Sequence, residues 1–385
     1  MRSALFVTTV SSTLRGFLLP FARHFRAQGW RVDAAATGIS TCSECEAAFD
    51  HIFEVEWSRN VTDPRNLLHA PGIIKEIVKR GQYDIVHVHT PIAAFITRFA
   101  LRGFRSNNYP KIIYTAHGFH FYNGGSSLKN AIFLGMERLA GHWTDYLVVI
   151  NSEDLEAAHR YLIVPAERVL FMPGIGVDTE VLDPERISTE EVAKTRAMLG
   201  IQDKIPLFLM IAEFIPHKRH HDVLQAFARL NHSSAHLVLA GIGPQMEAMR
   251  VLADKLGIEK RVHFVGFRND IPQLIRSSVA VFLPSAREGL PRSAMEALSL
   301  GIPVIGSDIR GTNDLLAGDC GLLVELGDIE GLVNAMTWVL ENPEEASAMG
   351  QRGRSKMKNS CDVKAIIKLH EALYAKALGV NHALS

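Results

Sequence analysis

The sequence alternates short, β-branched apolar runs with longer amphipathic stretches, and this alternation starts again halfway along the chain. The apolar runs cover residues 4–10, 32–37, 84–89, 111–116 and 146–150, then 207–211, 236–240, 262–265, 279–283 and 304–306. Apolar strands separated by helical periodicity indicate a parallel sheet that is covered on both faces. The chain is therefore predicted to be α/β, with two Rossmann-like, doubly wound domains.

The length of 385 residues exceeds one ordinary hydrophobic core, which agrees with two domains. We expect an N-terminal domain over residues 1–180 and a second domain over 181–361. Residues 362–385 form a C-terminal helix and tail, and this helix could pack on either domain.

Composition narrows the class of protein. A formal net charge of zero argues against a nucleic-acid partner, and no apolar run approaches the roughly 18 residues that span a bilayer. The first residues are interpreted as a strand of a cytoplasmic enzyme, because the apolar run is short and no clear cleavage site follows it. Cys42 and Cys45 form a C-x-x-C in an expected loop, so we expect a structural or incidental role rather than metal or redox chemistry.

Ligands of an open parallel sheet bind beyond the carboxyl ends of its strands, so residues that directly follow strands are the candidates. Lys218 follows the strand at 207–211, where a helix is expected to begin, and a lysine at that point suits a diphosphate. The alternative is a solvated basic turn. The nearby histidines at 217, 220 and 221 lack a further well-placed ligand, so no metal is expected.

The strongest signal lies between residues 284 and 298, after another strand. Glu288 falls in the loop, Gly289 allows a ligand to approach the backbone closely, and Glu296 falls on the short helix that follows. Carboxylates suit sugar and ribose hydroxyls; the alternative is a surface loop with two solvated glutamates. Weaker candidates are the G-x-G-P turn that contains Gly243, and His117 and Gly16, each of which follows a first-half strand.

Glu288 and Glu296 are separated by seven residues, and this E-x7-E pattern resembles the signature of retaining glycosyltransferases of family 4, which have the GT-B fold with two domains facing a central cleft. Four further features agree in their order: the G-x-G-P turn, the strand end Val265-Gly266-Phe267, the basic turn at Lys218 and the histidine after a first-half strand. The resemblance covers nearly the whole chain. The run 115–125 is also similar to enzymes that assemble bacterial capsule or exopolysaccharide.

The resemblance implies a role for each candidate. Lys218 would contact the donor diphosphate, Glu288 the transferred sugar, and Glu296 the ribose hydroxyls. Phe267 and Arg268 would lie beside the base, and the backbone of Gly289, Leu290 and Pro291 near the sugar and phosphate. Gly243 is a further donor-binding candidate, and Gly16 would border donor and acceptor. His117 would line the sugar from the first domain. Many family members carry an arginine where this chain has Glu213, and Arg219 or Arg292 could replace it.

The implied reaction transfers a sugar from a nucleotide sugar, expected to be UDP-linked, to a hydroxyl, with retention at the anomeric carbon. The expected acceptor is a glycan, in particular a lipid-linked glycan in exopolysaccharide or capsule assembly, and no metal or other cofactor is expected. Two alternatives stay open: a nucleotide-sugar 2-epimerase of the same fold, and a nucleotide-sugar-binding subunit without turnover.

The charge distribution predicts peripheral attachment to an anionic membrane surface, on the inner face of the cell membrane. Residues 59–138 contain 11 Lys and Arg against 4 Asp and Glu. A second basic stretch carries arginines at positions 15, 23, 26 and 31 among the aromatic and aliphatic residues 17–25. Basic and aromatic surface attracts a protein to anionic headgroups; the alternative is that these apolar residues are the buried face of the first helix.

Overall fold

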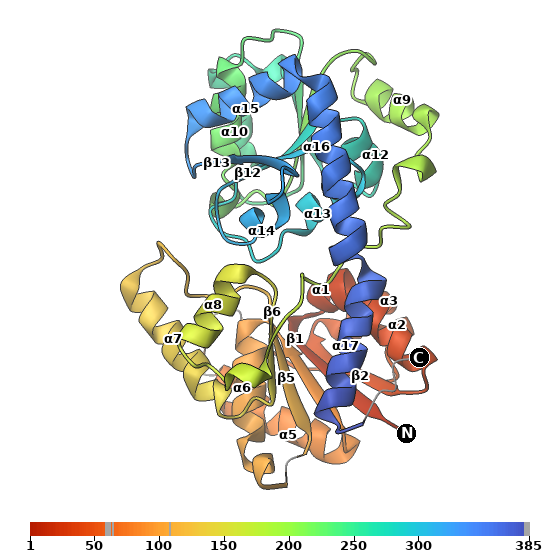
Figure 1. Cartoon of the computed structure of the whole chain (residues 1–385), viewed down its shortest axis with the longest axis vertical. Coiled ribbons are helices and arrows are strands. Elements are labelled where there is room, and N and C mark those ends of the chain that lie inside the picture. Colours follow the sequence, from red (N-terminus) through yellow and green to blue (C-terminus); the bar gives the residue numbers. More distant parts are fainter. Residues whose placement is uncertain (58–62, 64, 108, 381–385) are drawn as a thin grey trace. The chain divides into compact units, whose positions relative to one another are not determined.

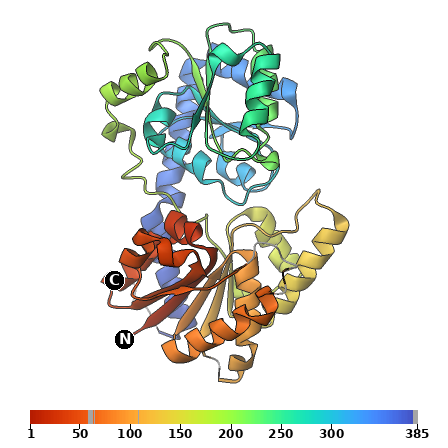
Figure 2. The same ribbon diagram turned by 180° about the vertical axis from the view of Figure 1, so that it is seen from behind.

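The computed structural model describes residues 1–57, 63, 65–107 and 109–380. The chain forms two compact units, of which one comprises Met1–Ile175 with Val363–Ser385 and the other Gly176–Asp362 (Figures 1 and 2). The first unit is thus made of two segments far apart in the sequence. The C-terminal helix α17 (Val363–Ala377), whose position the sequence left open, packs on this first unit.

The first unit contains a seven-stranded parallel sheet with the order β3-β2-β1-β4-β5-β6-β7. Its strands are β1 (Ser3–Val10), β2 (Arg31–Thr37), β3 (Ile52–Glu54), β4 (Ile85–His89), β5 (Lys111–Ala116), β6 (Tyr146–Val149) and β7 (Val169–Phe171). Side chains of β1 alternate between two cores, with Ala4 and Phe6 on one face and Leu5 and Val7 on the other. This double burial explains why the strands are apolar throughout rather than alternating.

Helices cover both faces of this sheet (Figure 1). They are α2 (Leu19–Ala27), α3 (Ser43–Ala48), α5 (Ala70–Gly81), α6 (Pro91–Leu101), α7 (Ser127–Gly141) and α8 (Ser152–Arg160), together with α17 and the short α1 (Ser11–Thr13) and α4 (Arg65–Leu68). The core on one face combines side chains of α2, α3 and α17. The other face is covered by α5, α6 and α8.

The second unit contains a six-stranded parallel sheet with the order β10-β9-β8-β11-β12-β13. Its strands are β8 (Leu207–Ile211), β9 (His236–Ala240), β10 (Val262–Gly266), β11 (Ala280–Leu283), β12 (Val304–Ser307) and β13 (Gly321–Val324). The helices are α9 (Thr189–Met198), α10 (His220–Arg229), α11 (Met246–Lys255), α12 (Ile271–Arg276), α13 (Arg292–Ser299), α14 (Thr312–Leu316), α15 (Ile329–Glu341) and α16 (Pro343–Lys356).

Each sheet has one point where the strand order reverses, and such a point leaves a crevice at the carboxyl ends of the two strands. In the first unit the reversal lies between β1 and β4, and in the second between β8 and β11. The fold therefore predicts which loops carry a site: those after β1 and β4, and those after β8 and β11.

The sequence predicted a basic and aromatic surface around the first helix, and this prediction is wrong for the apolar residues. Leu18, Leu19, Phe21 and Phe25 are buried in the core, because they form the inner side of the helical segment that precedes β2. Three of the four arginines there pair with acids, as Arg15 with Glu44, Arg26 with Asp50 and Arg31 with Asp33. Within the basic stretch 59–138, Arg59 lies outside the described residues. Arg98 is buried, so it adds no charge to the surface.

Candidate active site

The candidate residues divide into two groups, one in each unit, and each group lies at the carboxyl-end edge of its own sheet. Gly16 and His117 belong to the first unit. All the other candidates, including Lys218, Glu288 and Glu296, belong to the second.

In the first unit, Gly16 lies in a π-helical turn (Leu14–Leu18) that follows β1 and α1. A Cβ atom built on Gly16 would meet nothing within 4 Å, so the space beside this backbone is open. The next side chain, Phe17, stacks on the ring of His117, with ring centroids 6.4 Å apart and an angle of 24° between the planes. The turn after β1 and the residue after β5 are therefore in contact.

His117 directly follows β5 and contacts His89, the last residue of β4, with His117 Nε2 and His89 Nδ1 3.1 Å apart. Burial lowers the pKa of His117 to about 4, and His370 contributes in the same direction. The imidazole of His117 is therefore neutral near pH 7. It can exchange hydrogen bonds with a sugar hydroxyl, but it brings no positive charge to a phosphate.

Behind His117 lies a group of buried side chains that the sequence did not bring to attention. His87 lies between two hydroxyls, with Nδ1 2.6 Å from Tyr374 Oη and Nε2 2.8 Å from Thr115 Oγ1. The rings of His87 and His89 have centroids 4.2 Å apart, and burial lowers the pKa of both well below the usual value. The H-x-H pattern at the end of a buried strand was the signal, since residues two apart share one face.

In the second unit, Lys218 and Glu288 form an ion pair, with Lys218 Nζ 2.5 Å from Glu288 Oε1. Lys218 ends the 3₁₀ turn Pro216–Lys218 after β8, and Glu288 lies in the loop between β11 and α13. A backbone hydrogen bond of 2.7 Å from Ala286 N–H to His217 O joins the two loops. β8 and β11 are paired neighbours, so residues 70 positions apart meet at the reversal point of the sheet.

Glu296 lies in the second turn of α13 and pairs with Arg292, at 2.8 Å. Burial raises the pKa of the Glu296 carboxyl, and the charge of Arg292 acts in the opposite direction. The helix starts after Pro291, which has no side-chain acceptor, and no acidic residue lies in the first turn. The positive end of this helix is thus uncompensated by its own acids, and such an end favours an anion.

The loop that carries Glu288 is held in place by a turn after β12 that the sequence did not predict. Gly311 has φ +76°, and a Cβ atom there would lie 1.9 Å from Gly289 O. Arg310 Nε donates to the carbonyl of Glu288 at 3.3 Å. The Arg-Gly pair three residues after a strand was the available signal, since glycine marks close backbone approach.

The remaining donor-site candidates lie beside the carboxyl ends of β9 and β10. Gly243 packs against the preceding loop, because a Cβ atom there would lie 2.6 Å from Phe214 N. Phe267 is 71% exposed, whereas Arg268 is held by Asp270, with nitrogen–oxygen distances of 2.7 and 2.5 Å. A hydrogen bond from Gly241 N–H to Gly266 O joins the two turns, so these candidates form one neighbourhood.

Two arginines could replace the family arginine that is absent at position 213, and both already form ion pairs with acidic residues. Arg219 pairs with Asp222, and Arg292 pairs with Glu296. Glu213 itself is exposed. Both arginines would have to exchange a carboxylate partner for a phosphate.

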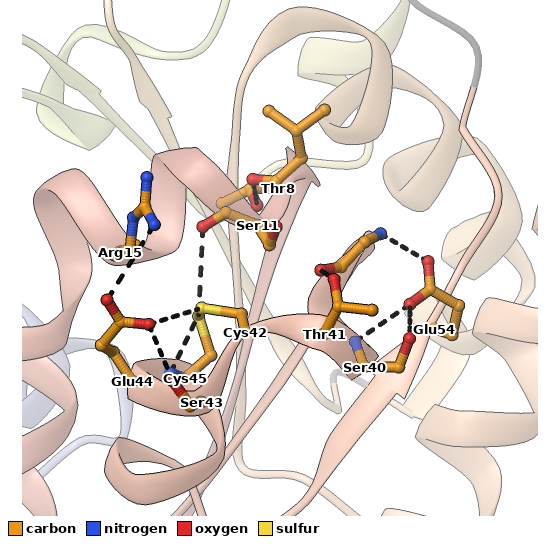
Figure 3. The surroundings of a disulfide bond; sticks show 12 residues. Thr8, Ser11, Arg15, Ser40, Thr41, Cys42, Ser43, Glu44, Cys45 and Glu54 are labelled. Atoms are coloured by element: carbon orange, nitrogen blue, oxygen red, sulfur yellow. Dashed lines mark hydrogen bonds and ion pairs between the residues drawn. A yellow bond between two sulfur atoms is a disulfide. The ribbon is translucent and has the colours of Figure 1, made fainter. Parts of the chain in front are cut away.

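The C-x-x-C motif lies at the start of α3, not in the loop that the sequence predicted. Cys42 and Cys45 form a disulfide, and Cys42 Sγ accepts the backbone N–H of Cys45 at 3.3 Å, which caps the helix (Figure 3). Cys45 Sγ also lies 4.0 Å from the carbonyl of Ser11, just after β1. Ser40 and Thr41 lie in the 3₁₀ turn before the motif, and the sequence-based prediction contained no helix after it. Over the described residues, no cluster of three or more His, Cys, Asp or Glu could hold a metal ion.

Family models match both halves of the chain. One described as Glycosyltransferase Family 4 covers residues 17–181, and one described as Glycosyl transferases group 1 covers residues 191–356. The chain is 32% identical to "Putative glycosyltransferase EpsD" of Bacillus subtilis (strain 168), over 92% of this chain and 91% of that protein. It is 28% identical to the UDP-Gal:alpha-D-GlcNAc-diphosphoundecaprenol alpha-1,3-galactosyltransferase of Escherichia coli, over 81% and 80%.

A solved structure confirms the fold. HepE of Anabaena in complex with UDP-glucose superimposes with a TM-score of 0.79 at 19% identity, over 97% of this chain and all of that one. The predicted arrangement, two Rossmann-like parallel-sheet domains of the GT-B class, is therefore confirmed.

Proposed function

Since the chain belongs to glycosyltransferase family 4 and is a glycosyltransferase, we propose that it moves a sugar from a UDP-sugar to a hydroxyl of a lipid-linked glycan, with retention at the anomeric carbon. The observation that carries the proposal is the ion pair between Lys218 and Glu288 at the reversal point of the second sheet. It offers one cation and one carboxylate at the place where open α/β sheets bind their ligands.

In the proposed reaction Lys218 and Glu288 separate, and each side chain then contacts a different part of the donor. Negative charge builds on the diphosphate as the bond to the sugar breaks, and a fixed ammonium nearby stabilises that charge most in the transition state. Lys218 would exchange Glu288 for the diphosphate. Glu288, released from Lys218, would accept hydrogen bonds from hydroxyls of the transferred sugar.

The positive end of α13 supports the same placement of the diphosphate. Gly289, Leu290 and Pro291 lead into this helix end, so their backbone would lie beside the sugar and the phosphates. Glu296 would accept from the ribose hydroxyls, and exposed Phe267 would lie beside the base. The neutral imidazole of His117 would line the sugar, with Gly16 at the border between donor and acceptor.

The names of similar proteins support the choice of donor and acceptor. The relative from Escherichia coli is named for UDP-Gal and a diphosphoundecaprenol-linked sugar, and the Anabaena structure holds UDP-glucose. We extend both features to this chain, and with them a role in exopolysaccharide or capsule assembly on the cytoplasmic side of the membrane. The departing phosphate oxygen can take the acceptor proton, so the proposed reaction needs no metal.

The test is a donor screen followed by a transfer assay. A panel of UDP-, GDP- and ADP-sugars is first screened by thermal shift, because a ligand of the native state raises the melting temperature. The donor that binds is then radiolabelled on the sugar and incubated, with and without chelator, with undecaprenyl-diphosphate-linked glycan. Label in the lipid fraction, an α-linked product from an α-linked donor and activity that survives chelator support the proposal. Conversion of the UDP-sugar without acceptor would point to the epimerase, and binding without turnover to the non-catalytic subunit.

A further inference from the structure

Helix α7 carries apolar side chains on the face that it turns away from the protein. Leu128, Ile132 and Leu139 are 72%, 53% and 51% exposed, and together they are called the α7 stripe. At 3.6 residues per turn these positions fall within roughly 40° of one another around the helix. A Cβ atom on Gly135, within the same face, would meet nothing within 4 Å, so no other part of the described chain covers the stripe there.

The charges on α7 have a matching arrangement. Lys129 and Arg138 are exposed and lie on opposite sides of the α7 stripe. The one acidic residue of the helix, Glu137, faces the protein, where it pairs with buried Arg98 at 2.9 Å. The outward face of α7 is therefore an apolar stripe bordered by two cations, with no acid.

The side of α7 opposite the stripe packs on the protein at the end of the helix. Gly141, the last residue of α7, packs against the carbonyl of Ile163. Leu162, the residue before Ile163, is 71% exposed and has φ +49°, a conformation that leucine rarely adopts. Figure 1 shows α7 at the outer edge of its unit, with α8 beside it.

We propose that α7 docks this enzyme on the anionic surface of a lipid bilayer, lying in the plane of the interface. The α7 stripe enters the boundary between headgroups and acyl chains, while Lys129 and Arg138 pair with headgroup phosphates. The two cations select lipid over a neutral protein partner, because an apolar stripe between two basic flanks complements a negatively charged interface.

This inference rests on the proposed lipid-linked acceptor, whose location it explains. The chain reaches α7 directly from the loop that begins at His117, the first-unit candidate for contact with the sugar. A helix held in the interface would therefore keep this loop near the membrane, where an acceptor hydroxyl on a lipid diphosphate is found.

The test is co-sedimentation of the full chain with vesicles of phosphatidylcholine, with and without phosphatidylglycerol, over a salt series. The double variant Ile132→Ser/Leu139→Ser should lower the partition coefficient at least about tenfold, since two partly exposed aliphatic side chains lose their burial in lipid. Lys129→Gln/Arg138→Gln should lower it by about fivefold per charge at low salt, and less at high salt. The matched control Val181→Ser/Met198→Ser removes apolar side chains that are each 59% exposed, in the second unit, and should leave partition unchanged.

Three results would overturn the inference. The wild-type chain could stay in the supernatant with anionic vesicles at low salt, or the stripe variant could sediment as the wild type does. The stripe variant could also convert a dimer into a monomer without any change in vesicle binding, which would make the stripe a contact between two copies. UDP-induced thermal shifts of all variants show whether the fold is intact. If wild-type partition depends on α7 but no sugar reaches a lipid-linked acceptor, the proposed acceptor is wrong while the docking surface stands.

Discussion

Replacement of Lys218 by alanine separates the two roles proposed for this residue. The side chain of Lys218 is 21% exposed and that of its partner Glu288 is 10% exposed, so the ion pair is mostly shielded from water. From the sequence, a lysine in an exposed loop predicts almost no effect on stability. The structure changes that expectation, because Lys218→Ala leaves the Glu288 carboxylate in a poorly solvated position without its cation.

Two magnitudes follow. Loss of one donor that stabilises developing charge costs about 2.7–4 kcal/mol in the transition state, which lowers kcat by about 10² to 10³. Loss of a partner for a mostly buried charged group costs about 1–3 kcal/mol of folding stability. The double variant Lys218→Ala/Glu288→Gln removes the unpaired charge and should therefore recover most of the stability but none of the turnover.

The assay combines initial rates of sugar transfer with urea unfolding of the ligand-free protein. Lys260→Ala is the matched control, since Lys260 is an exposed lysine of the same unit. Less than a tenfold loss of kcat in Lys218→Ala would refute the proposed contact with the diphosphate. Equal stability of the single and double variants would refute the argument from the unpaired carboxylate.

Three further predictions concern the two glutamates, the buried histidines and the turn after β12. Glu288→Gln should lower turnover with little change in UDP affinity, whereas Glu296→Gln should weaken UDP binding by calorimetry; equal losses of affinity would contradict the assignment. His117 has a pKa of about 4 in the folded chain against about 6.5 when unfolded, so the unfolded state binds more protons between these values and the free energy of unfolding should fall as pH drops from about 6.5 to 4. His117→Asn should flatten that part of the stability curve. Gly311→Ala should weaken UDP binding and destabilise the fold, while Gly318→Ala, with φ +80° and no atom within 4 Å, should cost only about 1 kcal/mol of backbone strain.

The sequence predicted the positions of the candidate residues better than their contacts. Lys218 and Glu288 were found separately, because each follows an apolar strand and the carboxyl ends of parallel strands meet at one edge. Their ion pair could not be predicted, since it requires that β8 and β11 be neighbours although two other strands separate them in the sequence. Strand order is a property of tertiary packing, which periodicity does not encode.

The histidines around His117 and the stripe on α7 were missed for different reasons. His87 hydrogen-bonds Tyr374, 287 residues away, and no local pattern connects the two. In α7, apolar side chains lie on the inner and the outer face, so the helix shows no clear polar side. Its outward stripe becomes visible only when the inward face is known. The error for the first helix was the opposite one. Its aromatic residues were predicted to lie on the surface, because four arginines lie among them in the sequence, but they are packed in the core.

The position of α17 has a consequence for how the chain is made. Ile366, Leu373 and Tyr374 of α17 are buried in the same core as Phe21 and Phe25 of α2. That core stays incomplete until synthesis has passed residue 374, by which time all of 176–362 has already been synthesised. Domains usually fold as units in the order of their synthesis. Here the order is reversed: the half of the enzyme that is translated first is the last to finish its core, and a nascent chain stalled before α17 would expose the apolar face of α2 to chaperones.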